Sequence, residues 1–319
     1  MRATFRLIFM VAALALSVSA PAQEFPSKPI RIIVPYPPGG GTDRTGRLLA
    51  ERFQAKWGQS VLVENRSGAG GAGAEYAAKA APDGYTLLFA AQAQFVIVQA
   101  LYDKLGYDPD AMVPISTITT SPNVLVVNPK IPVESLARLI SFAKENPGKL
   151  NYASTGSGSS QHLAAELFKS MAGLDMLHIP YKGTAPAITD LVAGHVQLMF
   201  MEISNAITQV KAGKLRVIAV GGEKRHAAFP GTPALVETLP GFVSMQWTGL
   251  AAPAGTPSVI AEKIWTATVE ALKHPDTAQR IRELSLETVG STPAETTAFW
   301  RQERDRWGKV IRATGAKAD

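Results

Sequence analysis

The 319-residue sequence contains no cysteine, which excludes disulfide frameworks, thiolate metal sites and cysteine nucleophiles. It has no basic run with interleaved aromatic side chains, so nucleic acid is not expected as a partner. No two histidines share metal-ligand spacing with a carboxylate, so we expect no metal and no cofactor. The formal net charge of +6 is mild and is compatible with small anionic ligands without requiring them.

The chain begins with an export signal. Arg2 and Arg6 come before an apolar run, residues 7–16, and a stretch of small residues with an A-x-A-like end follows it. This run is shorter than the roughly 20 residues that span a bilayer. We expect residues 1–22 to be a signal peptide that is cleaved near Gln23. The alternative is a buried N-terminal helix.

The rest of the chain alternates short β-rich runs with amphipathic stretches of helical period, which is typical of parallel sheets with helices on both faces. With 46% hydrophobic residues, the chain is long enough to form two domains. The alternation fails once, where the runs 113–118 and 123–127 are joined only by Thr119–Pro122. The sequence therefore predicts an α/β protein of two domains, with one large open sheet as the alternative. The expected boundaries are 23–122 plus 224–319 for domain 1 and 123–223 for domain 2.

A glycine-rich loop follows the first expected strand, in the stretch VPYPPGGGTDRTGRLLAERF, and ordering it costs backbone conformational entropy. Consecutive glycines let the backbone approach a ligand closely, and a helix N-terminus carries about half a positive charge. We expect an anion cradle here, with Thr42 or Asp43 as the helix N-cap. A simple glycine hinge is the alternative. Within this first loop (residues 35–43), the expected ligand-binding residues are Tyr36, Pro38, Gly39, Gly40, Gly41, Thr42 and Asp43.

Two later strand ends repeat this layout. A Gly/Ser-rich loop precedes a helix in NYASTGSGSSQHLAAELFKSMAG, where Ser159 or Ser160 is the expected cap, and PYKGTAPAITDL forms another such loop. Three such loops, divided between two domains, would close on a carboxylate from both sides. The second loop (residues 155–160) and its helix contribute Thr155, Gly156, Ser157, Gly158, Ser159, Ser160 and His162. The third loop (residues 180–184) contributes Tyr181, Lys182, Gly183 and Thr184.

A resemblance to one family runs through FPSKPIRIIVPYPPGGGTDRTGRLLAERF, VENRSGAGGAGAEYAAKAAPDGYTLL, SPNVLVVNP, NYASTGSGSSQHLAAELFKSMAG, HIPYKGTAPAITDLVAGHVQLMF, KAGKLRVIAV and WTGLAAPAGTP. These segments resemble the substrate-binding receptors of tripartite tricarboxylate transporters, often called Bug proteins. The resemblance implies a type II periplasmic-binding fold that closes like a clamshell, each domain being a mainly parallel sheet flanked by helices. It implies a periplasmic, monomeric receptor that is not an enzyme. Its ligand would be a small carboxylate, held by amides, hydroxyls and water and delivered to membrane transporter subunits.

Two positions depart from the family pattern. Family members usually have a His-Ala-x-Asn-Pro stretch before LY, whereas this chain has QFVIVQALY, which puts Phe95 in the place of the histidine. After VQLMF the family tends to have Asp or Asn, and this chain has Met201-Glu202. We expect Phe95 and Glu202 to line the cleft, and the changes favour a more apolar or aromatic ligand than a short aliphatic diacid.

Three other interpretations have weaker support. GAGGAG, residues 68–73, matches a dinucleotide-binding pattern but lacks the acidic residue about 20 positions later, so a closely packed helix start is favoured. An exported serine hydrolase would use Ser157, Ser159 or Ser160 with His162, but the chain has no G-x-S-x-G elbow there. The same fold would also serve as a ligand sensor for a signalling partner.

Overall fold

This computed structural model describes residues 24–67, 71–102 and 104–316. The expected signal peptide, its cleavage point and the first three residues of GAGGAG lie outside these ranges. Within them, none of the helices has the length and apolar character needed to cross a membrane.

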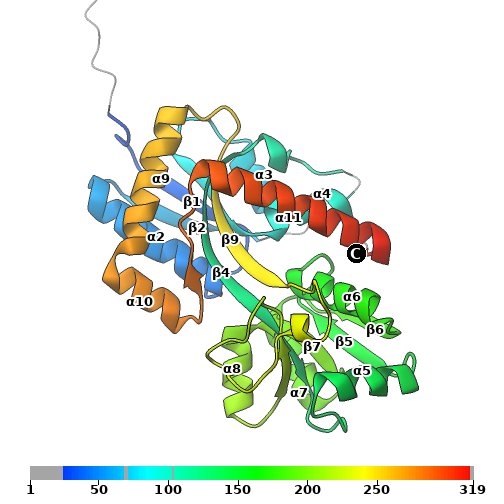
Figure 1. Cartoon of the computed structure of the whole chain (residues 1–319). Coiled ribbons are helices and arrows are strands. Elements are labelled where there is room, and N and C mark those ends of the chain that lie inside the picture. The colour runs from blue at the N-terminus through cyan, green and yellow to red at the C-terminus, as the bar shows by residue number, and fades with distance from the viewer. Residues whose placement is uncertain (1–23, 68–70, 103, 317–319) are drawn as a thin grey trace, which may run out of the picture.

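The first lobe is built on a mixed sheet with the order β2-β1-β3-β9-β4, in which β10 pairs with β4 (Figure 1). Strands β2, β1 and β3 are parallel, whereas β9 runs antiparallel to both β3 and β4. The strands are β1 (Ile30–Val34), β2 (Val61–Asn65), β3 (Thr86–Ala91), β4 (Val113–Val127), β9 (Met245–Ala252) and β10 (Glu287–Thr288).

Helices cover both faces of this sheet because successive strand residues point to opposite sides. Ile32 packs with α2 (Gly41–Trp57), α9 (Ser258–Lys273) and α10 (Pro275–Glu283), whereas Ile33 packs on the other side. That other side holds α3 (Ala72–Ala78), a π-helical turn (Ala93–Ile97), α4 (Val98–Leu101) and α11 (Pro293–Thr314). A short 3₁₀ turn, Pro109–Ala111, leads into β4.

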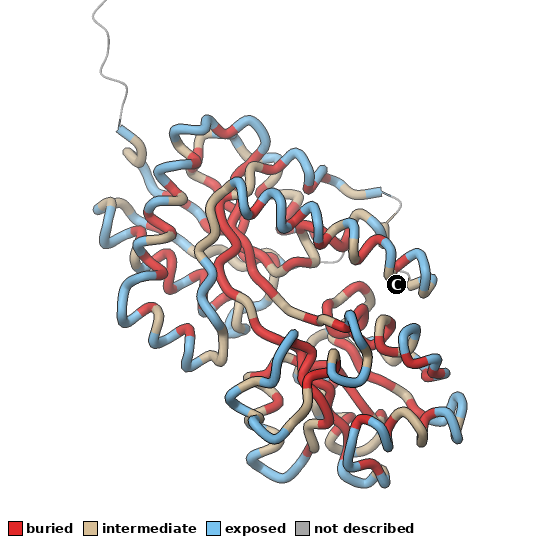
Figure 2. Tube along the Cα trace, viewed as in Figure 1, coloured by how far each residue is buried: buried red, intermediate tan, exposed pale blue. Residues whose placement is uncertain are grey.

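The second lobe has its own sheet, in which the end of β4 pairs with β7 and β8, and β7 leads on to β5 and β6. Its strands are β5 (Leu150–Ser154), β6 (Met176–Pro180), β7 (Leu198–Glu202) and β8 (Arg216–Val220). Helices α5 (Leu136–Glu145) and α6 (Ser160–Ala172) pack on one face, and α7 (Thr184–Ala193) and α8 (Ile203–Lys211) on the other. Buried residues follow the strands of both sheets (Figure 2). The mixed α/β fold expected from the sequence is confirmed.

Strand β4 passes from one sheet into the other. Its residues 113–122 pair with β9, and its residues 123–127 pair with β7 and β8. The two β-rich runs that the sequence shows are therefore one strand of 15 residues. Pro122, which has no amide hydrogen, lies where β4 leaves β9 for its partners in the second lobe.

The chain returns to the first lobe later than the sequence indicated. Residues 224–242 were expected in domain 1, but Leu235 and Phe242 are fully buried in the core of the second lobe. This segment includes a 3₁₀ turn, Leu235–Glu237, and β9 then begins at Met245. Its apolar side chains are spread among prolines and glycines, so no periodic pattern showed which core they join.

Three chain segments meet where the lobes join. The Gly221 amide donates to the Asn123 carbonyl at 2.7 Å, and the Ser244 amide donates to the Gly221 carbonyl at 2.7 Å. The Asn123 amide donates to the Ser244 carbonyl at 3.0 Å. A Cβ atom at Gly221 would lie 2.8 Å and 2.9 Å from two of these backbone oxygens, so only glycine fits without a shift.

We therefore predict that Gly221→Ala lowers the free energy of unfolding by about 1–3 kcal/mol, because the added methyl group forces the backbone of the junction apart. Urea denaturation measures this change. Gly222→Ala is the matched control, since the nearest atom to its Cβ would be 3.4 Å away. Equal unfolding midpoints for the two variants would contradict the prediction.

Candidate functional site

The three loops expected to bind a ligand lie where the lobes face each other. In the first lobe, a Cβ built on Gly41 would lie 3.9 Å from Oε2 of Glu202, which ends β7 in the second lobe. Strand β7 is parallel to β5, and the carboxyl end of β5 leads into the second loop. The first loop, Glu202 and the second loop therefore share one region, which we call the interlobe face.

The second and third loops are neighbours within their lobe. The Tyr181 amide donates to the Ser154 carbonyl at 3.1 Å, and a Cβ on Gly156 would lie 3.5 Å from the Tyr181 carbonyl oxygen. The second loop also contacts the first lobe, because a Cβ on Gly158 would lie 2.2 Å from Cδ1 of Leu101. The structure thus brings together loops that are about 140 residues apart in sequence.

The first loop leaves backbone amides without partners. Helix α2 begins at Gly41, its N-cap is Gly40, and no side chain caps it, so the expectation that Thr42 or Asp43 is the N-cap is wrong. The first amides of a helix have no partner inside that helix. Among the hydrogen bonds of the described residues, none uses the amides of Gly40, Gly41 or Thr42. Tyr36 is half-buried beside this loop, and Pro38 is exposed.

Asp43 braces the loop instead of capping the helix. Its side chain is 3% exposed, and its carboxylate accepts hydrogen bonds from the Gly39 backbone amide at 2.8 Å, from Arg47 Nε at 3.1 Å and from the side-chain Nδ2 of Asn65 at 2.9 Å. Burial alone would raise the pKa of Asp43, but the bonds from Arg47, Gly39 and Asn65 outweigh it and lower the pKa. The Gly39 amide, expected to contact the ligand, is therefore used inside the loop.

Half of the six backbone amides of the second loop, those of Gly156, Gly158 and Ser159, are bonded within the loop or to flanking residues. The Ser159 hydroxyl accepts the His162 amide at 3.2 Å, which confirms Ser159 as the N-cap of α6. The Gly158 amide donates to Nδ1 of His162 at 3.0 Å, and the Gly156 amide donates to the Ser154 hydroxyl at 3.1 Å. The His162 ring also stacks on the ring of His178, with 4.0 Å between centroids. His162 therefore packs within the second lobe and stabilises the loop through its bond to the Gly158 amide.

Hydroxyl groups of the second loop also form hydrogen bonds within the loop and its helix. The Thr155 and Ser160 hydroxyls donate to Oε1 of Gln161 at 3.0 Å and 3.3 Å. Ser157 differs, since no hydrogen bond among the described residues uses its hydroxyl or amide. The sequence indicated a row of free donors, but a loop this tight satisfies most of its polar groups itself.

In the third loop, the Tyr181 side chain is held by a hydrogen bond, whereas Lys182 is exposed to solvent. The Tyr181 hydroxyl donates to Oδ2 of Asp190 at 2.7 Å, and burial together with this bond raises the pKa of Tyr181 to about 12. Lys182 is exposed, and none of the ion pairs of the described residues includes it. Gly183 is the N-cap of α7 with φ of 108°, and Thr184 is the first residue of that helix.

Phe95 does not line the interlobe face. Its side chain is 2% exposed and stacks on Trp300, with 4.2 Å between ring centroids, and on Trp247 at 6.1 Å. The expectation that Phe95 lines the cleft is therefore corrected. The run of apolar residues in QFVIVQALY packs against α11 in the core of the first lobe.

Sequence reasoning missed three buried side-chain amides, of which those of Asn123 and Gln246 lie beside Glu202. Gln92 is 1% exposed, and neither its Oε1 nor its Nε2 has a partner. Asn123 lies opposite Glu202 in the β4–β7 ladder, and its buried Oδ1 also lacks a partner. Gln246 Oε1 is buried without a partner, while its Nε2 donates to Oε1 of Glu202 at 3.0 Å. Gln92 follows β3, Asn123 lies inside β4 and Gln246 is the second residue of β9, so the three share no periodic signal in the sequence.

The electrostatics of the interlobe face centre on two groups. Burial raises the pKa of Glu202, against the opposing effects of Gln246 and Arg44. Burial also raises the pKa of Tyr36 to about 12, with Gln94 acting against it. Gln94 and the Ala91 backbone are close to the Tyr36 hydroxyl, yet no partner meets hydrogen-bond geometry.

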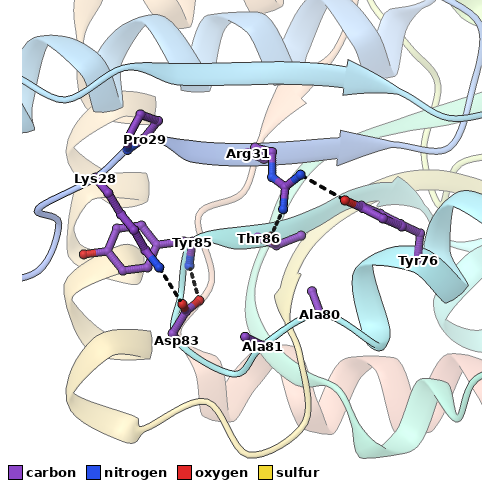
Figure 3. A pocket seen from close by; sticks show the side chains of 9 residues that line it. All are labelled: Lys28, Pro29, Arg31, Tyr76, Ala80, Ala81, Asp83, Tyr85 and Thr86. Carbon is purple, nitrogen blue, oxygen red and sulfur yellow. Dashed lines mark hydrogen bonds and ion pairs between the residues drawn. The ribbon is translucent and has the colours of Figure 1, made fainter.

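A separate surface hollow of about 360 Å³ lies at the amino ends of β1 and β3 (Figure 3). Arg31 donates to the Tyr76 hydroxyl at 2.9 Å, and Lys28 pairs with Asp83 at 3.0 Å. Its lining is Lys28, Pro29, Arg31, Tyr76, Ala80, Ala81, Asp83, Tyr85 and Thr86. The first loop leaves the opposite end of β1, so this hollow is not part of the interlobe face.

The fold and the loops at its interlobe face define a periplasmic binding protein. Rpa4515 of R. palustris, solved with adipate, is 34% identical, with a TM-score of 0.84 over 92% of this chain and 99% of that one. MatC from Rhodopseudomonas palustris, with bound malate, is 32% identical, with a TM-score of 0.80 over 90% and 100% of the two chains. The periplasmic binding protein BugD is 32% identical, with a TM-score of 0.81 over 92% and 100%.

The chain belongs to the tripartite tricarboxylate transporter receptor family, whose model matches residues 45–316. Protein BugT of Bordetella pertussis is 36% identical over 96% of this chain and 95% of its own length. A UPF0065 protein of Pseudomonas sp. strain P51 is 36% identical over 94% and 91% of the two chains. The resemblance seen in the sequence is therefore confirmed, and the protein is a periplasmic solute-binding receptor of this family.

We predict that Asp43→Asn lowers the free energy of unfolding at pH 7 by about 1.5–3 kcal/mol, because the bonds to Asp43 involve charged groups. The folded-state pKa is lowered, so this contribution is present above about pH 4 and is lost as the pH falls through the folded value. The stabilities of wild type and variant should converge in acid, as measured by urea denaturation across pH.

Asp305→Asn, at an exposed position on α11, is the control and should leave stability unchanged at every pH. A gap between wild type and Asp43→Asn that stays constant into acid would show that the carboxylate charge is not what holds the loop.

Proposed function

We propose that the protein captures a small carboxylate in a cleft at the interlobe face and delivers it to a tripartite tricarboxylate-type membrane transporter. The observation that carries this proposal is the set of unpartnered amides at Gly40, Gly41 and Thr42. They begin a helix of 17 residues and lie opposite Glu202 in the other lobe. A helix start with free amides is suited to an anionic group.

One helix end is not enough for tight binding. It contributes about 0.3–1 kcal/mol at an exposed site, whereas micromolar affinity needs about 8 kcal/mol. In our proposal the remainder comes from the unbonded amide and hydroxyl of Ser157 and from the exposed cation of Lys182. Closure of the lobes would exclude water and strengthen each of these contacts.

Relatives support a carboxylate as the ligand. Rpa4515 was solved with adipate and MatC with malate, and each aligns with at least nine tenths of this chain. Two departures from the family pattern, at Phe95 and Glu202, favoured a more apolar or aromatic ligand. The first no longer supports it, because Phe95 lies in the core. Glu202 is the departure from the family pattern that does lie at the interlobe face, so in our proposal it distinguishes the ligand of this protein from the ligands of its relatives.

The proposed cycle makes and breaks no covalent bond. The receptor would act as an exported monomer, released from its signal peptide near Gln23, and would need no cofactor. Binding energy then comes from hydrogen bonds and closure alone, so the measurable property is affinity and not turnover.

We predict that Gly40→Val weakens carboxylate binding at least tenfold and leaves the fold intact. Gly40 has φ of −71° and nothing within 4 Å of its Cβ position, so valine fits the backbone but places its side chain over the free amides. A thermal-shift screen of mono-, di- and aromatic carboxylates identifies a ligand, and calorimetry then gives its dissociation constant.

Gly231→Val is the matched control, since Gly231 is exposed and also has nothing within 4 Å of its Cβ position. An unchanged dissociation constant for Gly40→Val would remove the first loop from the site. Stabilisation by no carboxylate at all would reject the proposed function.

A further inference from the structure

We propose that two leucines, one from each lobe, hold the lobes together by apolar contact and so favour the closed arrangement before any ligand binds. The two residues are Leu163 on α6 and Leu101 on α4, and we call them the leucine pair. This inference goes beyond the proposed function, because it concerns the balance between open and closed protein and assumes no class of ligand.

Leu163 lies in one lobe and packs in the core of the other. Helix α6 is part of the second lobe, and its residues Ala164, Ala165 and Phe168 are buried in the core of that lobe. Leu163 is 0% exposed and packs instead with the core of the first lobe. Helix α11 of the first lobe contacts α6, and its C-terminal half extends toward the second lobe (Figure 1). Neighbouring sides of α6 therefore contact different lobes.

The core that receives Leu163 is built of aromatic side chains held in fixed positions. The Nε1 atoms of Trp247 and Trp307 donate to Oε2 of Glu303 at 3.2 Å and 3.1 Å, and this carboxylate is buried. The Trp300 ring stacks on the Trp247 ring, with 5.4 Å between centroids. All of these residues belong to the first lobe. The apolar surface that Leu163 contacts therefore keeps its shape when the lobes separate.

Leu101 makes the reverse contact, from the first lobe to the second. It is half-buried and packs against the same aromatic core. Its Cδ1 occupies the space that a Cβ atom at Gly158 would need, so the bare backbone of the second loop lies against this leucine. Gly158 has φ of 78°, which also favours glycine at this position. The leucine pair thus holds the second loop and the start of α6 against the first lobe.

The leucine pair differs in kind from the junction between the lobes. At the junction, Asn123, Gly221 and Ser244 are joined by backbone hydrogen bonds, which a hinge can keep while it bends. The side chains of Leu163 and Leu101 are hydrocarbons, so they separate without breaking a hydrogen bond. Separation exposes their apolar surface to water, and this favours the closed arrangement.

A favoured closed arrangement has a consequence for any ligand that the closed form binds. The apparent affinity of a protein is reduced by the fraction of molecules that are not competent to bind, so the leucine pair would keep that reduction small. The alternative is a permanent interface, in which α6 and α11 never separate and Leu163 contributes to stability alone. Both arrangements predict lower stability when Leu163 is truncated, but only ours predicts a change in the distance between the lobes.

The test measures that distance between two spin labels in protein refolded from urea without added ligand. The chain has no cysteine, so Gln302→Cys on α11 and Lys144→Cys on α5 introduce one exposed label site in each lobe. We expect one main interlobe distance in the labelled parent. Leu163→Ala should add a longer distance and raise the ratio of open to closed molecules by about tenfold or more, because truncating a buried leucine weakens its packing strongly. Leu101→Ala should act in the same direction.

Leu167→Ala is the matched control, because Leu167 lies one turn further along α6 and packs against the core of its own lobe. It should add no longer distance. Leu163→Met conserves volume and should keep the distance of the parent. Unchanged distances in both Leu163→Ala and Leu101→Ala, or a parent that is already mainly open, would overturn the inference. None of these outcomes depends on carboxylate binding, so failure of the leucine pair and failure of the proposed function are separate results.

Discussion

The interaction on which the interlobe face depends is the hydrogen bond from the Gly39 amide to the buried carboxylate of Asp43. A loop with three glycines in a row has high conformational entropy when unfolded, and ordering it is costly. Asp43 fixes its end, and Arg47 and Asn65 fix Asp43 in turn. Because the brace takes only the Gly39 amide, the following amides stay in position and unbonded. The loop is ordered in advance, which would lower the entropic cost of the binding that we propose.

The second constraint is the way the chain passes between the lobes. Strand β4 belongs to both sheets, and its middle is held at Asn123 by backbone bonds to Gly221 and Ser244. The same residue places its side chain opposite Glu202. The junction that fixes the two lobes relative to each other therefore also forms one wall of the interlobe face. A shift of the lobes would move the first loop relative to Glu202, which is how closure would control the fit of a ligand.

Much of this architecture could be predicted from the sequence. Apolar periodicity located β1, α2 and α6, and Gly/Ser-rich strand ends identified the loops that meet between the lobes. The continuity of β4 and the packing of Leu235 and Phe242 on the second lobe could not be predicted, because both are decided by tertiary contacts with distant strands. The role of Asp43 was also missed. An acid near a helix start satisfies the rule for an N-cap equally well whether it caps the helix or binds the loop before it.

The polar groups around Glu202 were missed for a different reason. Asn123 and Gln246 belong to two different strands and Gln92 follows a third, and each is unremarkable in its own segment. Only the fold shows that Asn123 and Gln246 lie beside the Glu202 carboxylate. Buried polar groups without hydrogen-bond partners destabilise a protein core, and natural cores contain few of them. Asn123 and Gln246 lie where the two lobes meet, beside Glu202, so their polar groups belong to the junction between the lobes and not to the core of either one.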